Sequence, residues 1–154
     1  SYKGVSLNIM MQWSYGNKIM NELRRTRNAM RTTSNLGQDA LARWKAQGDI
    51  TNFPMIRYQD KMENFRPSSF NMEDGSFLRI KEITLSYNIP PKWCKKVFLK
   101  SANVYISGTN LLTWSKYSGY DPEVNTSTSP FIQGVDNGAF PKSRSYNLGV
   151  NFTF

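Results

Sequence analysis

The chain has 154 residues, a single cysteine (Cys94) and no histidine. This composition excludes an internal disulfide, the usual zinc sites and any nucleophile activated by histidine. The formal net charge is +9, so nucleic acid has to be considered as a partner, but no run of residues approaches the roughly 20 apolar positions of a membrane-spanning helix.

The first predicted element is a strand over about residues 4–15. Its odd positions from Val5 to Tyr15 are large and apolar, whereas its even positions are mostly Ser, Asn or Gln. A period of two is typical of a strand with one apolar and one polar face. The pair Gly16-Asn17 is typical of a turn, and we expect it to end the strand.

Residues 16–76 are predicted to form a long loop that contains short helices. Residues 18–31 carry a weak helical stripe of apolar side chains among arginines. Residues 39–47 predict a better helix, because they begin with Asp39, consist of strong helix formers and stop at Gly48. A loop of this length is uncommon inside a compact soluble domain and counts against one.

Two further strands are predicted at about 77–89 and 101–113. The short basic segment 90–100 joins them and begins with two prolines, which end a strand. A second long loop follows at 114–142, because this stretch holds the Gly, Pro, Asp and Asn residues expected of turns.

The strand at 77–89 changes phase near its start. Leu78 and Ile80 have the opposite parity from the apolar residues later in the strand, and Arg79 and Lys81 lie beside them. One interpretation is a β-bulge that shifts the phase. The other is that the two charges lie on the apolar side, close to a boundary with water.

The last predicted strand, at about 145–154, has the most regular pattern in the chain. Every even position is large and apolar, and every odd position from 147 to 153 is small or polar. The strand ends on an aromatic residue, whereas a soluble domain usually ends in a polar tail. The apolar positions are Tyr146, Leu148, Val150, Phe152 and Phe154.

Three features of these strands favour a membrane over a soluble sandwich. Their polar positions are mostly Ser, Asn, Thr, Gln and Gly, whereas a sheet that faces water usually carries more charge. Nine residues at about 3.4 Å each, tilted as in a barrel, span roughly the ~25 Å apolar band of an outer-membrane barrel. One short turn alternates with two long loops, as in bacterial barrels.

The pattern therefore predicts an all-β fold, the last four antiparallel strands of a large transmembrane β-barrel. The short segment 90–100 becomes the periplasmic turn, 16–76 and 114–142 become external loops, and the carboxy-terminus lies at the periplasmic face. Four strands cannot close a barrel, and open edges in hydrocarbon leave backbone groups unpaired. We therefore expect the remaining strands elsewhere in a larger protein. A soluble all-β module that binds glycan through exposed aromatic residues is the alternative.

Seven runs of the chain are informative when taken together, namely residues 43–44, 48–52, 76–90, 104–114, 117–124, 134–144 and 146–154. In this order they are similar to the end of the barrel in SusC/RagA-type TonB-dependent transporters. The similarity covers nearly the whole chain.

The resemblance implies a Gram-negative outer-membrane barrel of about 22 strands with a plug in its lumen. It also implies TonB-dependent import of glycans or oligopeptides together with a SusD-like surface lipoprotein. The plug and the TonB-binding region lie outside this sequence. The apolar positions of residues 146–154 resemble the terminal signal that the barrel-assembly machinery reads. The implied partners are the other strands and plug of the transporter, the lipoprotein, TonB and outer-membrane lipid.

The second external loop supplies the candidate contacts to a ligand or partner. Its aromatic rings are able to stack on sugars, although such residues also form interfacial girdles or pack a loop on itself. The candidates are Trp114, Tyr117, Tyr120, Phe131 and Phe140. We expect Trp44 in the first loop to be a packing residue.

We predict no metal site, no cofactor and no enzymatic activity. Asp121, Glu123 and Asp136 offer oxygen ligands, but they lack the spacing of a calcium loop. No paired-carboxylate motif or phosphate-binding loop occurs, and Cys94 is expected to be an ordinary free thiol.

We also predict no nucleic-acid partner, because neither basic run lies beside stacking aromatics or a known motif. Both runs are read first as solvated surface. The first, in an external loop, has anionic lipid, the lipoprotein or an acidic substrate as alternative partners. The runs are Arg24, Arg25, Arg27 and Arg31, and Lys92, Lys95, Lys96 and Lys100.

Overall fold

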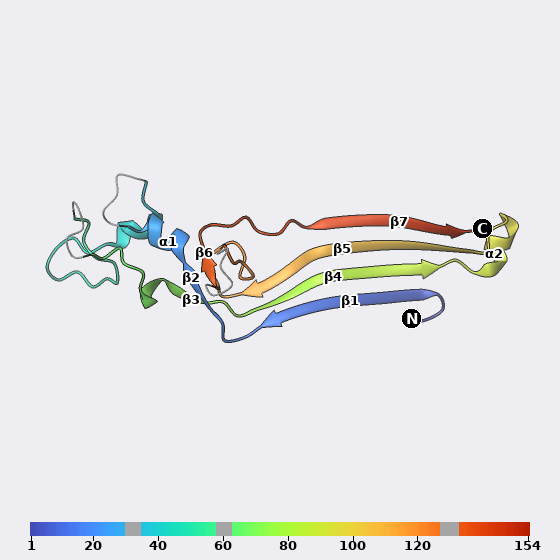
Figure 1. Cartoon of the computed structure of the whole chain (residues 1–154), viewed down its shortest axis with the longest axis horizontal. Coiled ribbons are helices and arrows are strands. Elements are labelled where there is room, and N and C mark those ends of the chain that lie inside the picture. Colours follow the sequence, from blue (N-terminus) through green and yellow to red (C-terminus); the bar gives the residue numbers. More distant parts are fainter. Residues whose placement is uncertain (30–34, 58–62, 127–132) are drawn as a thin grey trace. The chain divides into compact units, whose positions relative to one another are not determined.

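The four predicted strands pair into one antiparallel sheet in the computed structural model of the chain (Figure 1). The structure describes residues 1–29, 35–57, 63–126 and 133–154. Each strand begins and ends within two residues of the expected bounds, and the all-β fold is confirmed. In spatial order the strands are β1 (Val5–Ser14), β4 (Phe77–Asn88), β5 (Ser101–Ser115) and β7 (Ser145–Thr153).

Both long connections, residues 16–76 and 114–142, leave the sheet at the same end, as its register shows. Ser14 at the end of β1 lies opposite Phe77 at the start of β4, and Phe77 lies opposite Ser115 at the end of β5. The chain divides into two units. The sheet unit holds Ser1–Tyr15, Ser76–Lys116 and Lys142–Phe154, and the loop unit holds Gly16–Gly75 and Tyr117–Pro141.

One face of the sheet is apolar and exposed along all four strands. One row across it pairs Leu7 with Leu85, Leu85 with Ile106, and Ile106 with Leu148. These side chains are exposed at 60, 44, 50 and 76 %, respectively. Opposed side chains share a face, so the alternation in each strand adds up to one continuous surface. A contiguous apolar surface of this extent marks a site that meets protein or lipid.

The change of phase in β4 is produced by a bulge at Lys81. Glu82 and Ile80 lie opposite consecutive residues of β1, so Lys81 is the extra residue. The shift places Ile80 on the apolar face opposite Met11 and turns Arg79 to the other face. Arg79 is buried there and its Nε donates to Thr113 Oγ1 at 2.9 Å. The bulge interpretation is confirmed, and the placement of Arg79 on the apolar side is wrong.

A packing contact explains why the last strand contains a glycine. Gly149 lies opposite Tyr105 on the polar face of the sheet. A Cβ atom at position 149 would lie 2.3 Å from Cζ of Tyr105, so the tyrosine ring occupies the space over the glycine. Only glycine fits beneath this ring without moving it.

The turn at 90–100 contains a short helix, α2 (Pro91–Lys96), which the alternation did not predict. Proline at its first position has the backbone angle that a helix start needs. Cys94 is buried in this helix, and its thiol lies 3.7 Å from the carbonyl oxygen of Ile89. The free thiol of Cys94 is therefore part of the packing of the turn.

The loop unit contains a second sheet that the sequence did not reveal. It consists of β2 (Lys18–Asn21), β3 (Met72–Asp74) and β6 (Val135–Asp136), in the order β3-β2-β6. Its described residues also form helix α1 (Glu22–Arg27) and the short 3-10 helices η1 (Gln38–Ala42) and η3 (Ser69–Asn71). Among the described residues, no helix has the length and apolar character needed to cross a bilayer.

Both helix predictions in the first loop need correction. The stretch 18–31 begins as strand β2, because Ile19 is buried between neighbouring strands, and only its middle part is helical; positions 30 and 31 lie outside the described residues. The helix predicted at 39–47 is a 3-10 helix that ends at Ala42. It stops because Arg43 is extended and the Trp44 amide donates to the Phe53 carbonyl at 3.0 Å.

Candidate functional site: a polar cleft in the loop unit

The site is built where strand β2 passes into helix α1. Asn21, the last residue of β2, caps the helix because its Oδ1 accepts from the Arg24 backbone amide at 2.8 Å. Its Nδ2 donates to Glu73 Oε1 at 3.1 Å and to Ser118 Oγ at 3.3 Å. One side chain therefore ends a strand, starts a helix and joins segments far apart in the sequence.

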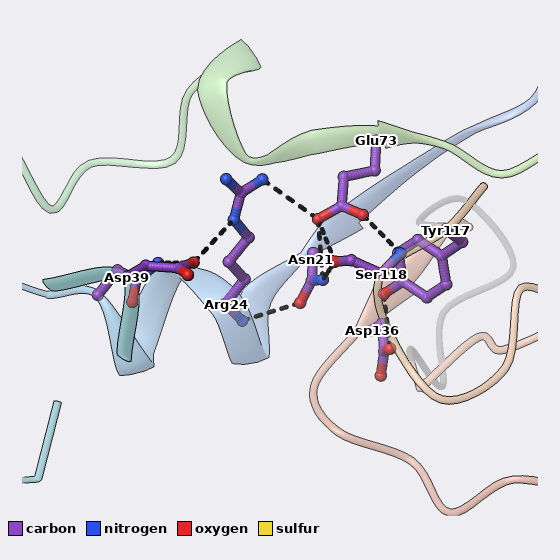
Figure 2. A network of polar contacts seen from close by, with 8 residues as sticks. Asn21, Arg24, Asp39, Glu73, Tyr117, Ser118 and Asp136 are labelled. Carbon is purple, nitrogen blue, oxygen red and sulfur yellow. Dashed lines mark hydrogen bonds and ion pairs between the residues drawn. The ribbon is translucent and has the colours of Figure 1, made fainter. Parts of the chain in front are cut away.

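Glu73, on β3, is the centre of the network in Figure 2. The Ser118 amide donates to Glu73 Oε2 at 2.9 Å, and the Ser118 hydroxyl donates to Oε1 at 2.8 Å. Arg24 Nη1 donates to the same Oε1 at 3.3 Å. Only 12 % of the Glu73 side chain is exposed, so these contacts replace most of its hydration. The carboxylate therefore connects both ends of the first loop with the start of the second loop.

The environment of Glu73 favours its charged form. Burial by itself raises the pKa of this carboxyl group, but the hydrogen bonds from Ser118 and Asn21 and the charge of Arg24 outweigh it. The net result is a pKa below the ordinary value. Glu73 is therefore ionised and fully engaged at neutral pH, which makes it a structural anion.

A second buried pair supports the start of the second loop. The Tyr117 hydroxyl donates to Asp136 Oδ2 at 2.6 Å, and Asp136 Oδ1 accepts from the amides of Gly138 and Ala139 at 2.7 and 3.1 Å. Burial raises the pKa of Tyr117, and the hydrogen bond to Asp136 raises it further. Tyr117 is therefore a neutral donor that holds the 135–139 turn.

A cleft of about 490 Å³ opens beside this network. Arg24, Arg27 and Asp39 lie along it with Ser118, and Tyr120 adds an aromatic ring. Asp39 Oδ2 accepts from Asn28 Nδ2 at 3.1 Å and lies 3.9 Å from Arg24 Nε. The cleft thus offers donors, acceptors and one ring that is 67 % exposed. This combination suits a polar ligand that also presents a flat apolar face.

Two of the four arginines in the first basic run form contacts inside the protein. Arg24 pairs with Glu73, and Arg25 pairs with Glu22 at 2.5 Å while its guanidinium lies 4.1 Å above the Phe65 ring. Arg27 lines the cleft. Position 31 lies outside the described residues. The interpretation of this run as solvated surface is therefore wrong for Arg24 and Arg25.

The structure describes four of the five predicted aromatic contacts, and each is described within its own unit. Of these four, Tyr120 lines the polar cleft of the loop unit, and Trp114 belongs to β5 in the sheet unit, where it lies opposite Leu78. Tyr117 is buried against Asp136 and is a packing residue. Phe140 is 95 % exposed, and position 131 lies outside the described residues. The contact role of Trp114, Tyr120, Phe131 and Phe140 stays a prediction.

The three acidic residues considered for calcium do not form a site. The 1–29, 35–57, 63–126 and 133–154 segments contain no group of three or more acidic, cysteine or histidine side chains able to hold a metal ion. Asp121 accepts from the Glu123 amide at 2.9 Å, as in a local turn, and Asp136 faces Tyr117. Trp44 lines a different cleft of the loop unit, which also contains Phe53 and Phe70.

Sequence reasoning missed Asn21, Glu73 and Ser118, which are the centre of the site. Each is a common polar residue in a stretch without periodicity, and the contacts among the three join positions 45 to 97 residues apart. The one available signal was Asn21 with Glu22, since Asn is a preferred helix cap and an acid is favourable in the first turn.

Comparisons with known proteins agree on one group of relatives. The chain is 31 % identical over its whole length to TonB-dependent receptor P26 of Formosa agariphila and covers 16 % of that protein. It is also 31 % identical over 56 % of its length to TonB-dependent receptor SusC of Bacteroides thetaiotaomicron, of which this match covers 8 %. No family model matches the chain.

Solved structures give the same result for the fold. The RagAB peptide importer in its closed-closed state matches the whole chain with a TM-score of 0.81 and 26 % identity. The open-open state of the same importer matches with a TM-score of 0.75 and 25 % identity. In both comparisons the chain spans 16 % of the matched chain. The chain therefore spans about one sixth of the relatives that it matches over its whole length.

Proposed function

Because this chain belongs to the SusC/RagA-type TonB-dependent transporters, we propose that it forms part of an outer-membrane importer of oligopeptides or glycans. The importer works with a SusD-like surface lipoprotein and draws its energy from TonB through regions outside this chain. Its role is transport and not catalysis, in line with the names of its relatives.

The exposed apolar face of the four-stranded sheet carries this proposal. Leu7, Leu85, Ile106 and Leu148 lie in one row across it, and the rows above and below are apolar too. Burying such side chains is favourable by about 25 cal/mol per Å², and a bilayer offers that burial without a protein partner. A soluble glycan-binding module, the alternative, would leave this surface in water.

The loop unit supplies the external part of the proposed importer. Residues 16–76 and 114–142 connect strands at one end of the sheet, and the 90–100 turn lies at its other end. With that turn in the periplasm, both long loops, which carry the polar cleft, belong to the external side of the proposed importer. Its mixture of charged groups with Tyr120 supports contact with an incoming oligopeptide or glycan, or with the lipoprotein.

Replacing Tyr120 by alanine in the full-length transporter is expected to weaken ligand binding about two- to tenfold, as expected for one aromatic contact. The measurement is the dissociation constant for labelled oligopeptides and, in parallel, labelled oligosaccharides, with the lipoprotein present. Ile50→Ala is the control, because Ile50 is fully exposed and does not line the cleft. If both variants bind like the wild type, the polar cleft has no role in ligand contact.

Deleting Phe154 is expected to lower the amount of transporter in the outer membrane. Tyr146, Leu148, Val150, Phe152 and Phe154 form the proposed assembly signal, and all five side chains are exposed. The measurement is the heat-modifiable, folded fraction in isolated outer membranes. A Thr153→Ser variant changes the neighbouring position by one methyl group and is the control. Unchanged insertion after the deletion would contradict the assembly role of Phe154.

A further inference from the structure

The turn at the 90–100 end of the sheet combines exposed apolar side chains with a high positive charge. Trp93, Val97 and Phe98 are exposed at 66, 61 and 92 %. The eleven residues from 90 to 100 include no acidic side chain. The lysines are Lys92, Lys95, Lys96 and Lys100, and all four are exposed. Neither the transport function nor the packing of the sheet accounts for this surface.

The geometry of α2 directs these side chains away from the sheet. Cys94 is the one buried residue of the helix, and its thiol faces the Ile89 carbonyl. The other five residues of this single-turn helix are exposed. Cys94 therefore attaches the helix to the end of the sheet, while Trp93 and the lysines project from it.

The end of α2 holds Phe98 in an unfavourable backbone conformation. The Leu99 amide donates to the Cys94 carbonyl at 3.0 Å, and the Phe98 amide donates to the Lys95 carbonyl at 3.4 Å. This is the bonding of a Schellman motif, whose left-handed position usually holds glycine. Phe98 occupies that position with a φ of 59°. A large aromatic residue is strained in this conformation. Because the ring is exposed, burial does not offset the strain.

The turn adjoins one end of the apolar face of the sheet. Tyr87 and Phe152 lie on that face near the end where α2 is attached, opposite Val104 and Ala102. Beyond this end of the sheet, the 90–100 turn adds the exposed side chains of Trp93 and Phe98 next to the lysines. Indole rings beside lysines are typical of the boundary between hydrocarbon and headgroups.

We propose that the 90–100 turn is an interfacial anchor that binds the headgroups of anionic phospholipids in the periplasmic leaflet. Trp93, Val97 and Phe98 enter the boundary of the acyl chains, and the lysines contact phosphate groups. This inference rests on the proposed function, because it requires the sheet to span the outer membrane with this turn in the periplasm. In this anchor the exposed ring of Phe98, which no contact within the sheet requires, is the part that contacts lipid.

The charge part of the anchor is tested on the full-length transporter by native mass spectrometry with titrated phosphatidylglycerol. The Lys95→Gln, Lys96→Gln double variant is expected to lower the apparent affinity by about tenfold, because each lysine near an anionic surface contributes severalfold. Lys18→Gln with Lys45→Gln removes the same charge from exposed positions in the loop unit and is expected to change nothing. Equal affinities for the two double variants would overturn the proposal.

The aromatic part is tested by Phe98→Gly and Phe98→Asn. Both residues suit the left-handed conformation, so the helix end is expected to keep or gain stability while phosphatidylglycerol affinity falls severalfold. A photoreactive phenylalanine analogue at position 98 then identifies the neighbour in cells. Cross-links to lipid support the anchor, whereas cross-links confined to the plug or to another periplasmic protein overturn it.

Folded, heat-modifiable protein in the outer membrane separates this proposal from the proposed function. If the transporter inserts and imports its ligand but the Lys95, Lys96 variant keeps full lipid affinity, the anchor alone is wrong. If the transporter does not reach the outer membrane at all, the proposed function is wrong.

Discussion

Replacing Leu148 by arginine is expected to remove most of the transporter from the outer membrane. Leu148 lies near the middle of β7 on the apolar face, opposite Ile106, and its side chain is 76 % exposed. A lipid-facing arginine at the bilayer midplane costs about 2–4 kcal/mol. The measurement is the fraction of folded, heat-modifiable protein in isolated outer membranes.

The neighbouring position gives a matched control. Asn147 precedes Leu148 in the same strand but points to the polar face, opposite Ser107. Asn147→Arg therefore adds the same side chain at nearly the same depth without placing it in lipid, and we expect near-normal insertion. If both variants lose folded protein from the outer membrane to the same extent, the apolar face is not the lipid surface. If both variants insert normally, the result contradicts the membrane proposal itself.

Replacing Glu73 by glutamine is expected to destabilise the loop unit by about 1.5–3 kcal/mol, the range for hydrogen bonds to charged groups. The neutral amide removes the charge that Arg24 faces and places an NH₂ group among the donors of Ser118 and Asn21. The measurement is the rate of limited proteolysis within the two long loops of the full-length transporter. The four strands of the sheet unit, β1, β4, β5 and β7, should stay protected, because none of these contacts involves them.

The surface pair of Glu63 and Arg66 is the control for Glu73. Glu63 lies 2.5 Å from Arg66, but both side chains are more than half exposed. Such pairs contribute about 0–1 kcal/mol. Glu63→Gln is therefore expected to leave proteolysis nearly unchanged. If Glu73→Gln also leaves the rate of proteolysis nearly unchanged, the network does not hold the two loops together.

The contribution of Glu73 to the stability of the loop unit has a defined pH dependence. Because its pKa is lowered in the folded protein, the stabilisation is fully present above the ordinary carboxyl pKa of about 4. It is lost as the pH falls through the lowered pKa. The difference in loop protection between wild type and Glu73→Gln should therefore be constant at neutral pH and shrink in acid.

The sequence was most informative where one physical requirement repeats along a strand. In β7, each residue from Tyr146 to Phe152 faces either the apolar or the polar side, so the period of two reports the environment directly. The bulge at Lys81 also left a visible signal, because an inserted residue reverses the parity of all residues before it. The sequence offered two explanations, and the pairing of Ile80 with Met11 selected one.

The loop unit was unpredictable for the opposite reason. Strand β2 has four residues and β6 has two, which is too short for any period to appear. The Glu73 site depends on contacts that join positions 45 to 97 residues apart along the chain, and no local pattern encodes such a contact. Tyr117 and Tyr120 are equivalent as sequence features, yet one is buried against Asp136 and the other lines the cleft.

By itself, the sequence determined that four amphipathic strands form the frame of this protein and that one face of each is apolar. That information is local, because every second side chain along a strand meets the same surroundings. Only the tertiary structure decided where the buried charges go, since the energy of a carboxylate such as Glu73 depends on which donors surround it after folding. The tertiary structure also placed Phe98 in its strained position, because that conformation follows from the hydrogen bonds that end α2.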